Sequence, residues 1–279
     1  MTEALLEARA LHLALPDLAR KPAFGRAPMK TILQDIDFSL ARGATLGVIG
    51  ESGSGKSTLA RVLTWLAPPQ GGEVLFEGRP VRGFSAAELL AYRARVQLVF
   101  QDPMSSLNPR RRVGASITQP LRALGRSAGR ADEARRAAEL LERVGLAPQL
   151  AQRWPHELSG GQRQRVGIAR ALALQPAALI ADEVTSGLDV SAQARIVALL
   201  DELRRDTGLA LIFISHDLSL VRSLCDEVLI LRLGQVVERG PSAQLFACPQ
   251  QAYTRELLDA IPLPVPEPGW LDRDEPAPV

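Results

Sequence analysis

Short apolar runs alternate with helix-patterned stretches along most of the chain. Apolar runs of this length predict strands, and the amphipathic stretches between them predict helices. The expected strands cover residues 10–15, 32–40, 45–50, 73–78, 96–100, 177–182 and 209–215, followed by a hairpin over 227–240 that turns near Gly234. Three of these runs (45–50, 177–182 and 209–215) are apolar nearly throughout, which is typical of strands covered on both faces. The alternation indicates an α/β fold with a largely parallel sheet.

A different pattern occupies residues 103–158. It is helical, with its clearest helix expected at 131–146, it is rich in arginine, and it contains no convincing strand. We therefore predict a helical lobe, about 103–165, inserted between two strands of the sheet. The prediction gives one domain over 1–262 and a tail over 263–279 whose proline-rich, acidic composition favours an extended chain.

The composition excludes several classes of protein. The chain is 46% hydrophobic and 23% charged, with a formal net charge of +2, so no basic excess points to nucleic acid as a partner. Cys225 and Cys248 form no CxxC pair, which argues against a disulfide scaffold or a zinc ribbon and favours a reducing compartment. No apolar stretch is long enough to span a bilayer as a helix, so any transport role requires another subunit for the channel.

The strongest chemical signal is the sequence GESGSGKST at 50–58, which fits G-x-x-x-x-G-K-[ST] between an apolar strand and a helix. Glycines let the backbone turn so that consecutive N–H groups face phosphate oxygens, and the following helix directs its positive end, ~half a charge, at the same phosphates. Lysine adds a point charge for the β and γ phosphates, and the Ser57 hydroxyl can bind Mg²⁺. The predicted nucleotide-binding residues here are Gly50, Glu51, Ser52, Gly53, Ser54, Gly55, Lys56, Ser57 and Thr58.

Two acids end the apolar run ALIADE at 178–183. Asp182 is expected at the carboxyl end of a buried strand, where α/β sheets bind ligands, and can hold Mg²⁺. Glu183 can orient or deprotonate an attacking water. Taken alone, such a pair is more often a strand end that meets solvent, so its weight comes from the neighbouring motifs.

A second anion site is predicted at LSGGQ, residues 158–162, where a donor-rich turn opens a long helix. An isolated SGG would be an ordinary helix cap. Two such anion sites in one chain, separated by an inserted lobe, need a better explanation than two ordinary caps. The residues assigned to it are Ser159, Gly160, Gly161 and Gln162.

Together these motifs resemble the nucleotide-binding subunits of ATP-binding cassette (ABC) transporters, over about residues 5–260. GESGSGKST looks like their Walker A motif, LSGGQ like their signature and ALIADE like their Walker B with its catalytic glutamate. Gln101 is similar to the Q-loop glutamine, Asp189 in SGLD to the D-loop and His216 to the switch histidine. The resemblance implies a P-loop NTPase fold with a mixed sheet, an antiparallel β region and the inserted lobe.

The same resemblance implies ATP and Mg²⁺ as cofactors, with Ser57, Gln101 and Asp182 around the metal, and Glu183, His216 and Gln101 as catalytic residues. A lone histidine after a buried strand is more often structural, so a catalytic role for His216 is inferred only because the other motifs are present. Two subunits are expected head to tail, with ATP between the Walker A loop of one and the signature of the other.

Longer matching stretches, such as VFQDPMSSLNPR and the segment YTRELLDAIP at 253–262, resemble the oligopeptide, dipeptide and nickel importer branch. The implied partners are permease subunits, a second nucleotide-binding subunit (a copy or a paralogue) and, indirectly, an extracytoplasmic solute-binding protein, with the chain peripheral to the cytoplasmic face of the inner membrane. The sequence departs from the family at Val184, where proline is usual, and at Leu15, where an adenine-stacking aromatic is common; Phe24 is a possible substitute.

Three other classes of P-loop ATPase or kinase are alternatives to the importer subunit. A cytosolic cassette ATPase of iron–sulfur assembly or translation would need no permease, although translation members usually hold two cassettes. A DNA-repair or chromosome-organising ATPase would carry a long insertion, whereas Lys56 and Ser159 are only 103 residues apart. A metabolic P-loop kinase leaves LSGGQ and SGLD unexplained.

Overall fold

The computed structural model describes residues 4–21, 25–102 and 106–260. The predicted tail at 263–279 and Phe24 lie outside the described residues, so both remain predictions. No described helix has the length and apolar character needed to cross a membrane.

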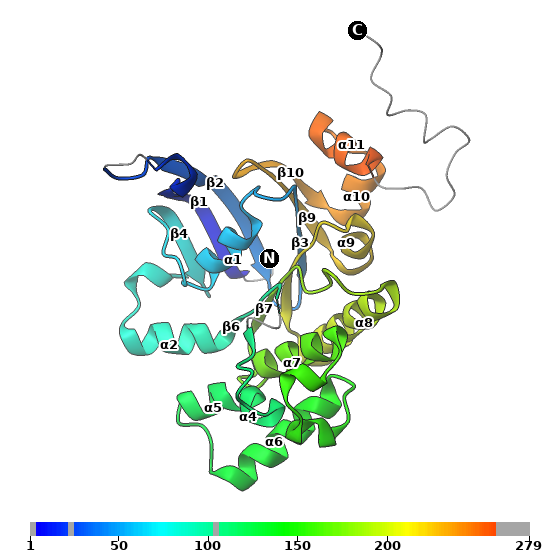
Figure 1. The fold of residues 1–279 in the computed structure, drawn as a ribbon. Helices are drawn as coiled ribbons and strands as arrows, with labels where there is room; N and C mark the ends of the chain where they lie inside the picture. The colour runs from blue at the N-terminus through cyan, green and yellow to red at the C-terminus, as the bar shows by residue number, and fades with distance from the viewer. Residues whose placement is uncertain (1–3, 22–24, 103–105, 261–279) are drawn as a thin grey trace, which may run out of the picture.

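The centre of the molecule is a six-stranded sheet (Figure 1). Its strand order is β10 (Gln235–Pro241), β9 (Glu227–Arg232), β3 (Thr45–Ile49), β8 (Ala210–Ile214), β7 (Ala178–Asp182) and β6 (Val96–Val99). All neighbours are parallel except β10 and β9, which form the expected hairpin. The predicted mixed, largely parallel sheet is confirmed, and the carboxyl ends of β3, β7 and β8 meet at one edge.

Each central strand is buried on both faces because alternate residues enter two different cores. Leu211 and Phe213 of β8 pack on one side, against the helices α7 (Gly160–Leu172), α8 (Val190–Thr207) and α9 (Leu218–Leu224). Ile212 and Ile214 pack on the other side, with the strands β1 (Ala4–Pro16) and β2 (Met29–Ala41) and the helix α1 (Lys56–Leu63). The nearly continuous apolar runs are the direct result of this double burial, as the sequence pattern predicted.

The antiparallel region is a four-stranded sheet in the order β2 (Met29–Ala41), β1 (Ala4–Pro16), β4 (Gly71–Phe76) and β5 (Arg79–Pro80). Strand β1 begins six residues before the expected run at 10–15. Its register shifts between Ala8 and Leu11, and Ala10 has a φ of 44°, so a bulge interrupts the alternation of side chains. Because of the bulge, buried and exposed side chains do not alternate regularly along β1, so the sequence pattern did not predict its first half. Leu5 and Leu6 in that half are both buried.

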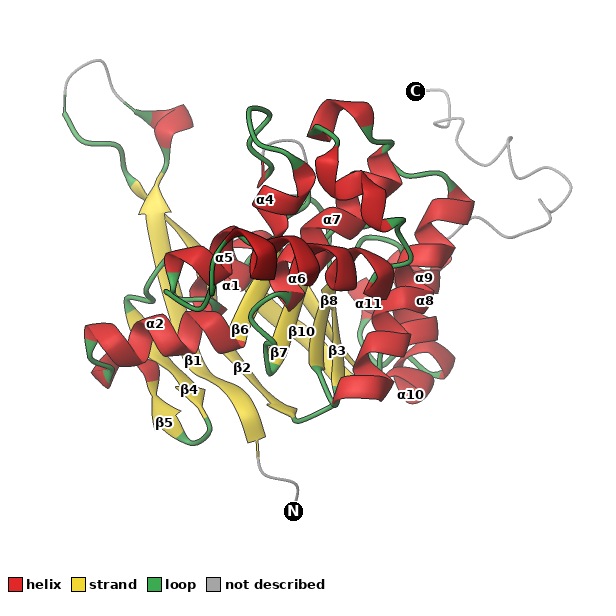
Figure 2. Ribbon diagram, turned by 90° about the horizontal axis from the view of Figure 1, so that it is seen from below, coloured by secondary structure: helices red, strands yellow, loops and turns green. Residues whose placement is uncertain are grey.

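Helices lie on both faces of the central sheet (Figures 1 and 2). They are α1 (Lys56–Leu63), α2 (Ala86–Arg95), α4 (Val113–Ile117), α5 (Gln119–Ala123), α6 (Arg130–Arg143), α7 (Gly160–Leu172), α8 (Val190–Thr207), α9 (Leu218–Leu224), α10 (Ser242–Ala247) and α11 (Ala252–Asp259), with short 3₁₀ turns η1 (Leu18–Arg20), η2 (Val81–Gly83), η3 (Pro148–Gln152) and η4 (Pro155–Glu157).

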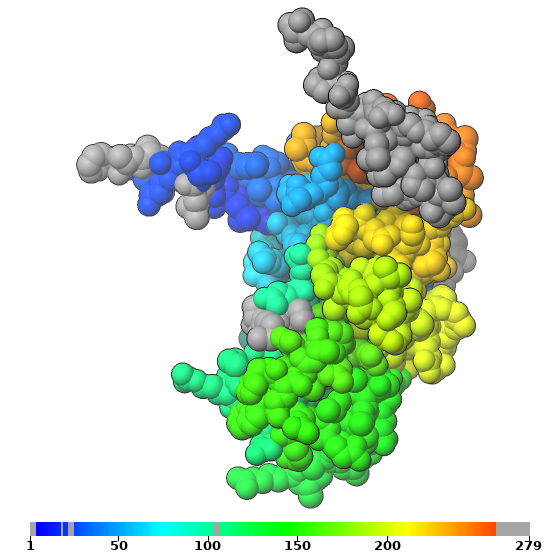
Figure 3. Space-filling view, turned by 45° about the vertical axis from the view of Figure 1, so that its right-hand side comes forward, coloured from blue at the N-terminus to red at the C-terminus, as the bar shows by residue number. Residues whose placement is uncertain are grey.

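The described residues between β6 and β7 are helical, with no strand among them. Helix α4 packs on both α6 and α7, and α7 also packs on β6. Val113, Ile117 and Leu141 are fully buried in this packing. The helices α4 to α6 therefore form the lower end of the molecule in Figures 1 and 3, joined to the sheet through α7. The lobe bounds of about 103–165 stay a prediction.

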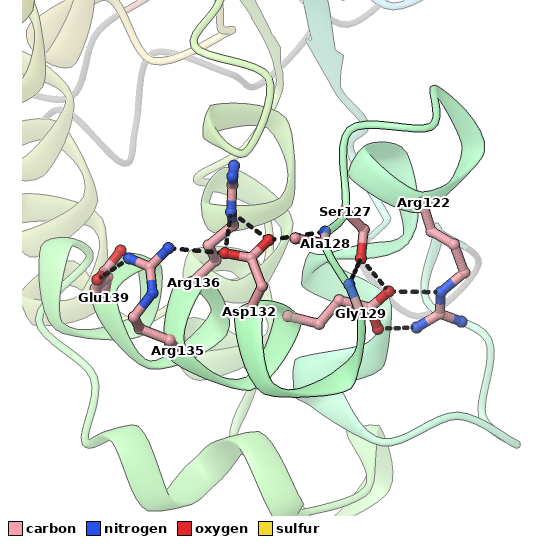
Figure 4. A network of polar contacts seen from close by, with 9 residues as sticks. Arg122, Ser127, Ala128, Gly129, Asp132, Arg135, Arg136 and Glu139 are labelled. Atoms are coloured by element: carbon pink, nitrogen blue, oxygen red, sulfur yellow. Dashed lines mark hydrogen bonds and ion pairs between the residues drawn. The ribbon is translucent and has the colours of Figure 1, made fainter.

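An ion-pair network closes the outer end of this helical region (Figure 4). Glu133 on α6 accepts hydrogen bonds from Arg122 and Ser127, and Asp132 accepts from Arg135 and Arg136. The network ties the loop after α5 to the first turn of α6, where acids are also favoured by the helix dipole.

Candidate functional site

The loop at 50–55 connects β3 to α1 through a backbone that only glycine permits at key points. A Cβ on Gly50 would lie 2.1 Å from the carbonyl oxygen of Leu231, so the loop passes directly against β9. Gly55 is the N-cap of α1, with a φ of 108° and no capping side chain. The first N–H groups of α1 are thus left without a side-chain acceptor, which suits an anionic ligand.

Lys56 is the first residue of α1 and is only 5% exposed. Its Nζ donates to the carbonyl oxygens of Gly50 at 2.7 Å and Glu51 at 2.8 Å, so the ammonium lies inside the curve of the loop. Burial lowers the pKa of Lys56, while the carboxylates of Glu183 and Asp182 act in the opposite direction. The loop holds a cation where a phosphate group is expected to bind.

Asp182 ends β7 and is 6% exposed. Its Oδ1 accepts a hydrogen bond of 3.2 Å from the Ser57 hydroxyl, which brings two predicted metal ligands together across 125 residues of sequence. Burial raises the pKa of the Asp182 carboxyl, and the neighbouring Glu183 raises it further. A hydroxyl and a carboxylate are oxygen ligands of the kind Mg²⁺ prefers, so these residues fit that cation.

Glu183 follows β7 with a φ of 47°, and its backbone N–H donates to the Ile214 carbonyl at 2.9 Å. Three predicted site residues surround its carboxylate. Gln101 donates from Nε2 at 2.8 Å, His216 Nδ1 lies 3.9 Å away and Lys56 Nζ lies 3.9 Å away. Residues from three other motifs therefore converge on Glu183.

Lys56, Ser57, Gln101 and Glu183 line a hollow of about 360 Å³ at the carboxyl edge of the sheet, whereas Asp182 and His216 do not line it themselves. The described residues that line it are Lys30, Ile32, Ser52, Gly53, Gly55, Lys56, Ser57, Thr58, Gln101 and Glu183. Lys30 and Ile32 on β2 were not predicted. Their only signal in the sequence is indirect, because Leu15, the position named for adenine stacking, is paired with Lys30 across the β1–β2 ladder and is 40% exposed.

The other predicted loop residues, Gly50, Glu51 and Ser54, do not line the hollow. Ser54 is buried and its hydroxyl makes no hydrogen bond with a described residue, while the Glu51 residue is exposed. Val184, found where the family usually has proline, is 1% exposed and packs in the core between the sheet and α7 to α9.

The LSGGQ residues do not join the hollow. Ser159 is the N-cap of α7, accepting from the Gln162 N–H at 3.3 Å, while the Gln162 side chain accepts from the Ser159 N–H at 2.9 Å. Gly160 and Gly161 follow in the first turn, and none of the four lines the hollow among the described residues. Ser159 and Gly160 are exposed to solvent.

Asp189 likewise lies outside the hollow, as the N-cap of α8. Its Oδ1 accepts from the Ala192 N–H at 2.8 Å and the Ser191 hydroxyl at 2.9 Å. The Ala192 hydrogen bond is the main cause of the lowered pKa of Asp189, and Ser191 contributes next. A single chain thus brings together one set of predicted residues and leaves a second set apart.

Comparison with known proteins adds independent evidence. A family model described as ABC transporter matches residues 33–186. The probable peptide ABC transporter ATP-binding protein y4tS of Sinorhizobium fredii is 49% identical over 245 residues, or 88% of this chain and 69% of the relative. The glutathione import ATP-binding protein GsiA of Escherichia coli is 50% identical over 234 residues, or 84% of this chain, and this match spans 37% of GsiA.

Solved structures agree with the fold. A dimeric post-hydrolysis state of the ATP-binding cassette MJ0796, bound to ADP and Pi, has a TM-score of 0.73 and 27% identity over 85% of this chain and 98% of that chain. A second is cbiO1 from Clostridium perfringens, part of the transporter complex cbiONQ, with a TM-score of 0.73 and 28% identity over 93% of this chain and 96% of that chain.

Proposed function

The chain belongs to the ABC transporter family, and on that premise we propose that it hydrolyses ATP to drive import of a peptide or related small solute through a membrane permease. The observation that carries the proposal is that Lys56, Ser57 and Glu183 line one hollow at the carboxyl edge of the sheet, where the Ser57 hydroxyl donates to Asp182. Ligands of α/β proteins bind at this edge.

The residues around Glu183 suit hydrolysis of the terminal phosphate. Lys56 and the uncapped first turn of α1 bind the β and γ phosphates of ATP. Glu183 is placed to orient or deprotonate a water, and Gln101 and His216 fix its carboxylate relative to the γ phosphate. When Mg²⁺ is bound by Ser57 and Asp182, it supplies positive charge that offsets the developing charge on the phosphates.

The exposed LSGGQ turn is the second half of a composite site. It is a helix N-terminus rich in donors, yet it lies away from the hollow of its own chain. Two subunits arranged head to tail would place this turn on the γ phosphate held by the partner's Walker A loop. ATP then favours the closed pair and ADP does not, which converts hydrolysis into motion.

The importer role follows from relatives named for peptide and glutathione import. We propose a dipeptide- or glutathione-like solute class, delivered by an extracytoplasmic binding protein. The chain would bind the cytoplasmic face of the permease as a peripheral subunit, through the helical region that follows Gln101. Its working partner is a second cassette, either a copy or a paralogue.

The test is reconstitution of the full chain with its permease and binding protein in lipid vesicles. We expect the chain to sediment with vesicles only when the permease is present, and ATP to drive solute uptake. Lys56→Ala should still sediment but support no uptake. Binding to no permease, with ATP hydrolysis intact in solution, would instead indicate a cytosolic cassette ATPase.

A further inference from the structure

A second lysine lines the same hollow as Lys56. Lys30 and Ile32 are two residues apart on β2, so their side chains lie on the same face of the strand, and both line the hollow. Lys30 is exposed, and its side chain forms no hydrogen bond or ion pair with a described residue. Among the described residues that line the hollow, Lys30 and Lys56 are the only cations. The proposed hydrolysis uses only Lys56.

The β9–β10 turn holds β2 beside the phosphate loop. The Gly234 N–H, in this turn, donates to the carbonyl oxygen of Ser54 at 2.9 Å, and the Gly234 carbonyl accepts from the Gln34 N–H at 2.8 Å. A Cβ on Gly55 would lie 2.8 Å from the carbonyl oxygen of Ile32, so β2 passes directly against the start of α1. The strand that carries the second lysine is therefore fixed relative to the loop.

Lys30 and Glu183 lie at different sides of the hollow. Lys30 is on β2, which contacts β10 and the β9–β10 turn, whereas Glu183 follows β7. In the six-stranded sheet, β3 and β8 separate β9 from β7. The proposed hydrolysis places the γ phosphate beside Glu183, so Lys30 faces the part of the nucleotide that does not react.

The charge of Lys56 is already opposed by carboxylates. Glu183 lies 3.9 Å from the Lys56 ammonium, and Asp182 accepts a hydrogen bond from the neighbouring Ser57. A polyphosphate carries several negative charges, and a further cation at the edge of the hollow attracts it more strongly than it would in bulk water. No aromatic side chain lines the hollow among the described residues, so stacking on the base contributes less than in a site with such a ring. Binding therefore depends more on the attraction between lysines and phosphates.

We propose that Lys30 is a second nucleotide-binding cation, whose ammonium attracts the phosphates that do not react. The inference rests on the proposed ATP-binding function. Because these phosphates are present in both ATP and ADP, Lys30 strengthens the binding of the two nucleotides equally. An interaction of equal strength in the ground state and the transition state lowers KM and leaves kcat unchanged. Lys30 therefore determines affinity, whereas Glu183 acts on the γ phosphate.

The test is Lys30→Gln in the full chain, which removes the charge and keeps a polar side chain. Calorimetry measures the affinity for ADP and for a non-hydrolysable ATP analogue, each with Mg²⁺, at low and high ionic strength. We expect about fivefold weaker binding of both ligands, a weaker dependence of affinity on salt, and a matching rise in the KM for ATP. The kcat should stay within about twofold of the unmodified value. The thermal midpoint without nucleotide should not change, because the exposed Lys30 side chain has no partner among the described residues.

Lys21→Gln is the matched control. Lys21 is also exposed and lies in the same connection between β1 and β2, but it does not line the hollow. The substitution removes the same charge and should leave both affinities unchanged. Lys30→Arg keeps a cation at the position and should bind both nucleotides as the unmodified chain does.

Unchanged affinity in Lys30→Gln would overturn the inference. A loss of affinity for the ATP analogue without a loss for ADP would also overturn it, because Lys30 would then act on the γ phosphate. An equal loss in Lys21→Gln would show that only the net charge of the chain matters. If the unmodified chain bound no nucleotide, the proposed function would fail, and this inference with it.

Discussion

At the scale of single residues, Glu183 has an unusual backbone conformation. A φ of 47° is uncommon for a residue with a side chain and costs roughly 1–3 kcal/mol. The hydrogen bond to Ile214 holds this conformation, and the carboxylate is thereby directed toward Gln101 and Lys56. Strain of this kind is often retained where a side chain has to be placed for chemistry.

Glu183→Gln should lower the turnover of ATP by about 10²- to 10⁴-fold, because the amide cannot accept a proton from water. ATP binding should survive, since Lys56 and the loop are unchanged. Phosphate release and analogue affinity measure the two effects separately. If Glu183→Gln hydrolysed ATP at the normal rate, Glu183 would not be the general base.

At the scale of elements, the β9–β10 turn determines the shape of the phosphate loop. Gly234 has a φ of 82°, and a Cβ there would lie 2.3 Å from the Ile32 carbonyl oxygen. Such an approach leaves no flexible neighbour to move aside. The loop motif and the turn are far apart in sequence, so the sequence alone gave no reason to connect them.

Gly234→Ala should destabilise the fold by roughly 1–3 kcal/mol and weaken ATP binding, because the turn must withdraw from Ser54 and β2. Gly240→Ala in the same hairpin is the control, since a Cβ there meets nothing within 4 Å. Urea unfolding and analogue titration provide the two measurements. Equal affinity in both variants would show that the turn does not shape the loop.

The helical region should be sensitive to acid. A hydrogen bond from Arg136 is the main cause that lowers the pKa of Asp132 to about 2. A hydrogen bond from Arg122 is the main cause that lowers the pKa of Glu133 to about 2. Because these values lie below the ordinary 3.8 and 4.5, their contribution to stability is complete above about pH 4.5 and is lost as the pH falls toward 2.

A chain with Asp132→Asn and Glu133→Gln should therefore show a weaker dependence of unfolding free energy on pH between 2 and 4.5. Glu142→Gln is the control on the same helix, because the Glu142 side chain forms no ion pair with a described residue. Urea unfolding followed by circular dichroism at stepped pH gives the slopes. Identical slopes in all three proteins would show that the network in Figure 4 does not stabilise the fold.

At the scale of the whole molecule, the predicted nucleotide residues fall into two groups that one chain cannot unite. Most of the Walker A residues line the hollow together with Gln101 and Glu183, whereas Ser159 caps a helix away from it. A second cassette is the simplest source of the missing half. The dimeric MJ0796 neighbour, bound to ADP and Pi, shows that a cassette of this fold can pair.

Glu183→Gln with Mg²⁺ and ATP should give a dimer in size-exclusion chromatography with light scattering, using its paralogue where the chain does not pair with itself. ADP should leave monomers. Adding Ser159→Arg should abolish the dimer by filling the second phosphate site. Ser85→Arg is the control: it removes the equivalent capping box from α2 and should leave the dimer intact. A dimer that persists with Ser159→Arg would contradict the head-to-tail arrangement.

The sequence by itself determined the parallel strands, the phosphate loop and the order of the motifs. Burial of a strand on both faces requires a continuous apolar run, and phosphate binding requires glycines and lysine at fixed spacing, so both are visible locally. The helical character of the residues between β6 and β7 was also visible, in a pattern that lacked strands.

Features that depend on contacts between distant segments were visible only in the tertiary structure. The bulge at Ala10 hid half of β1, and strand pairing alone brings Lys30 and Ile32 to the hollow. Tyr253 meets Arg232 only because α11 folds back on the β9–β10 hairpin. Side chains meet in space through packing that no local periodicity records, which is why these residues had no signal of their own.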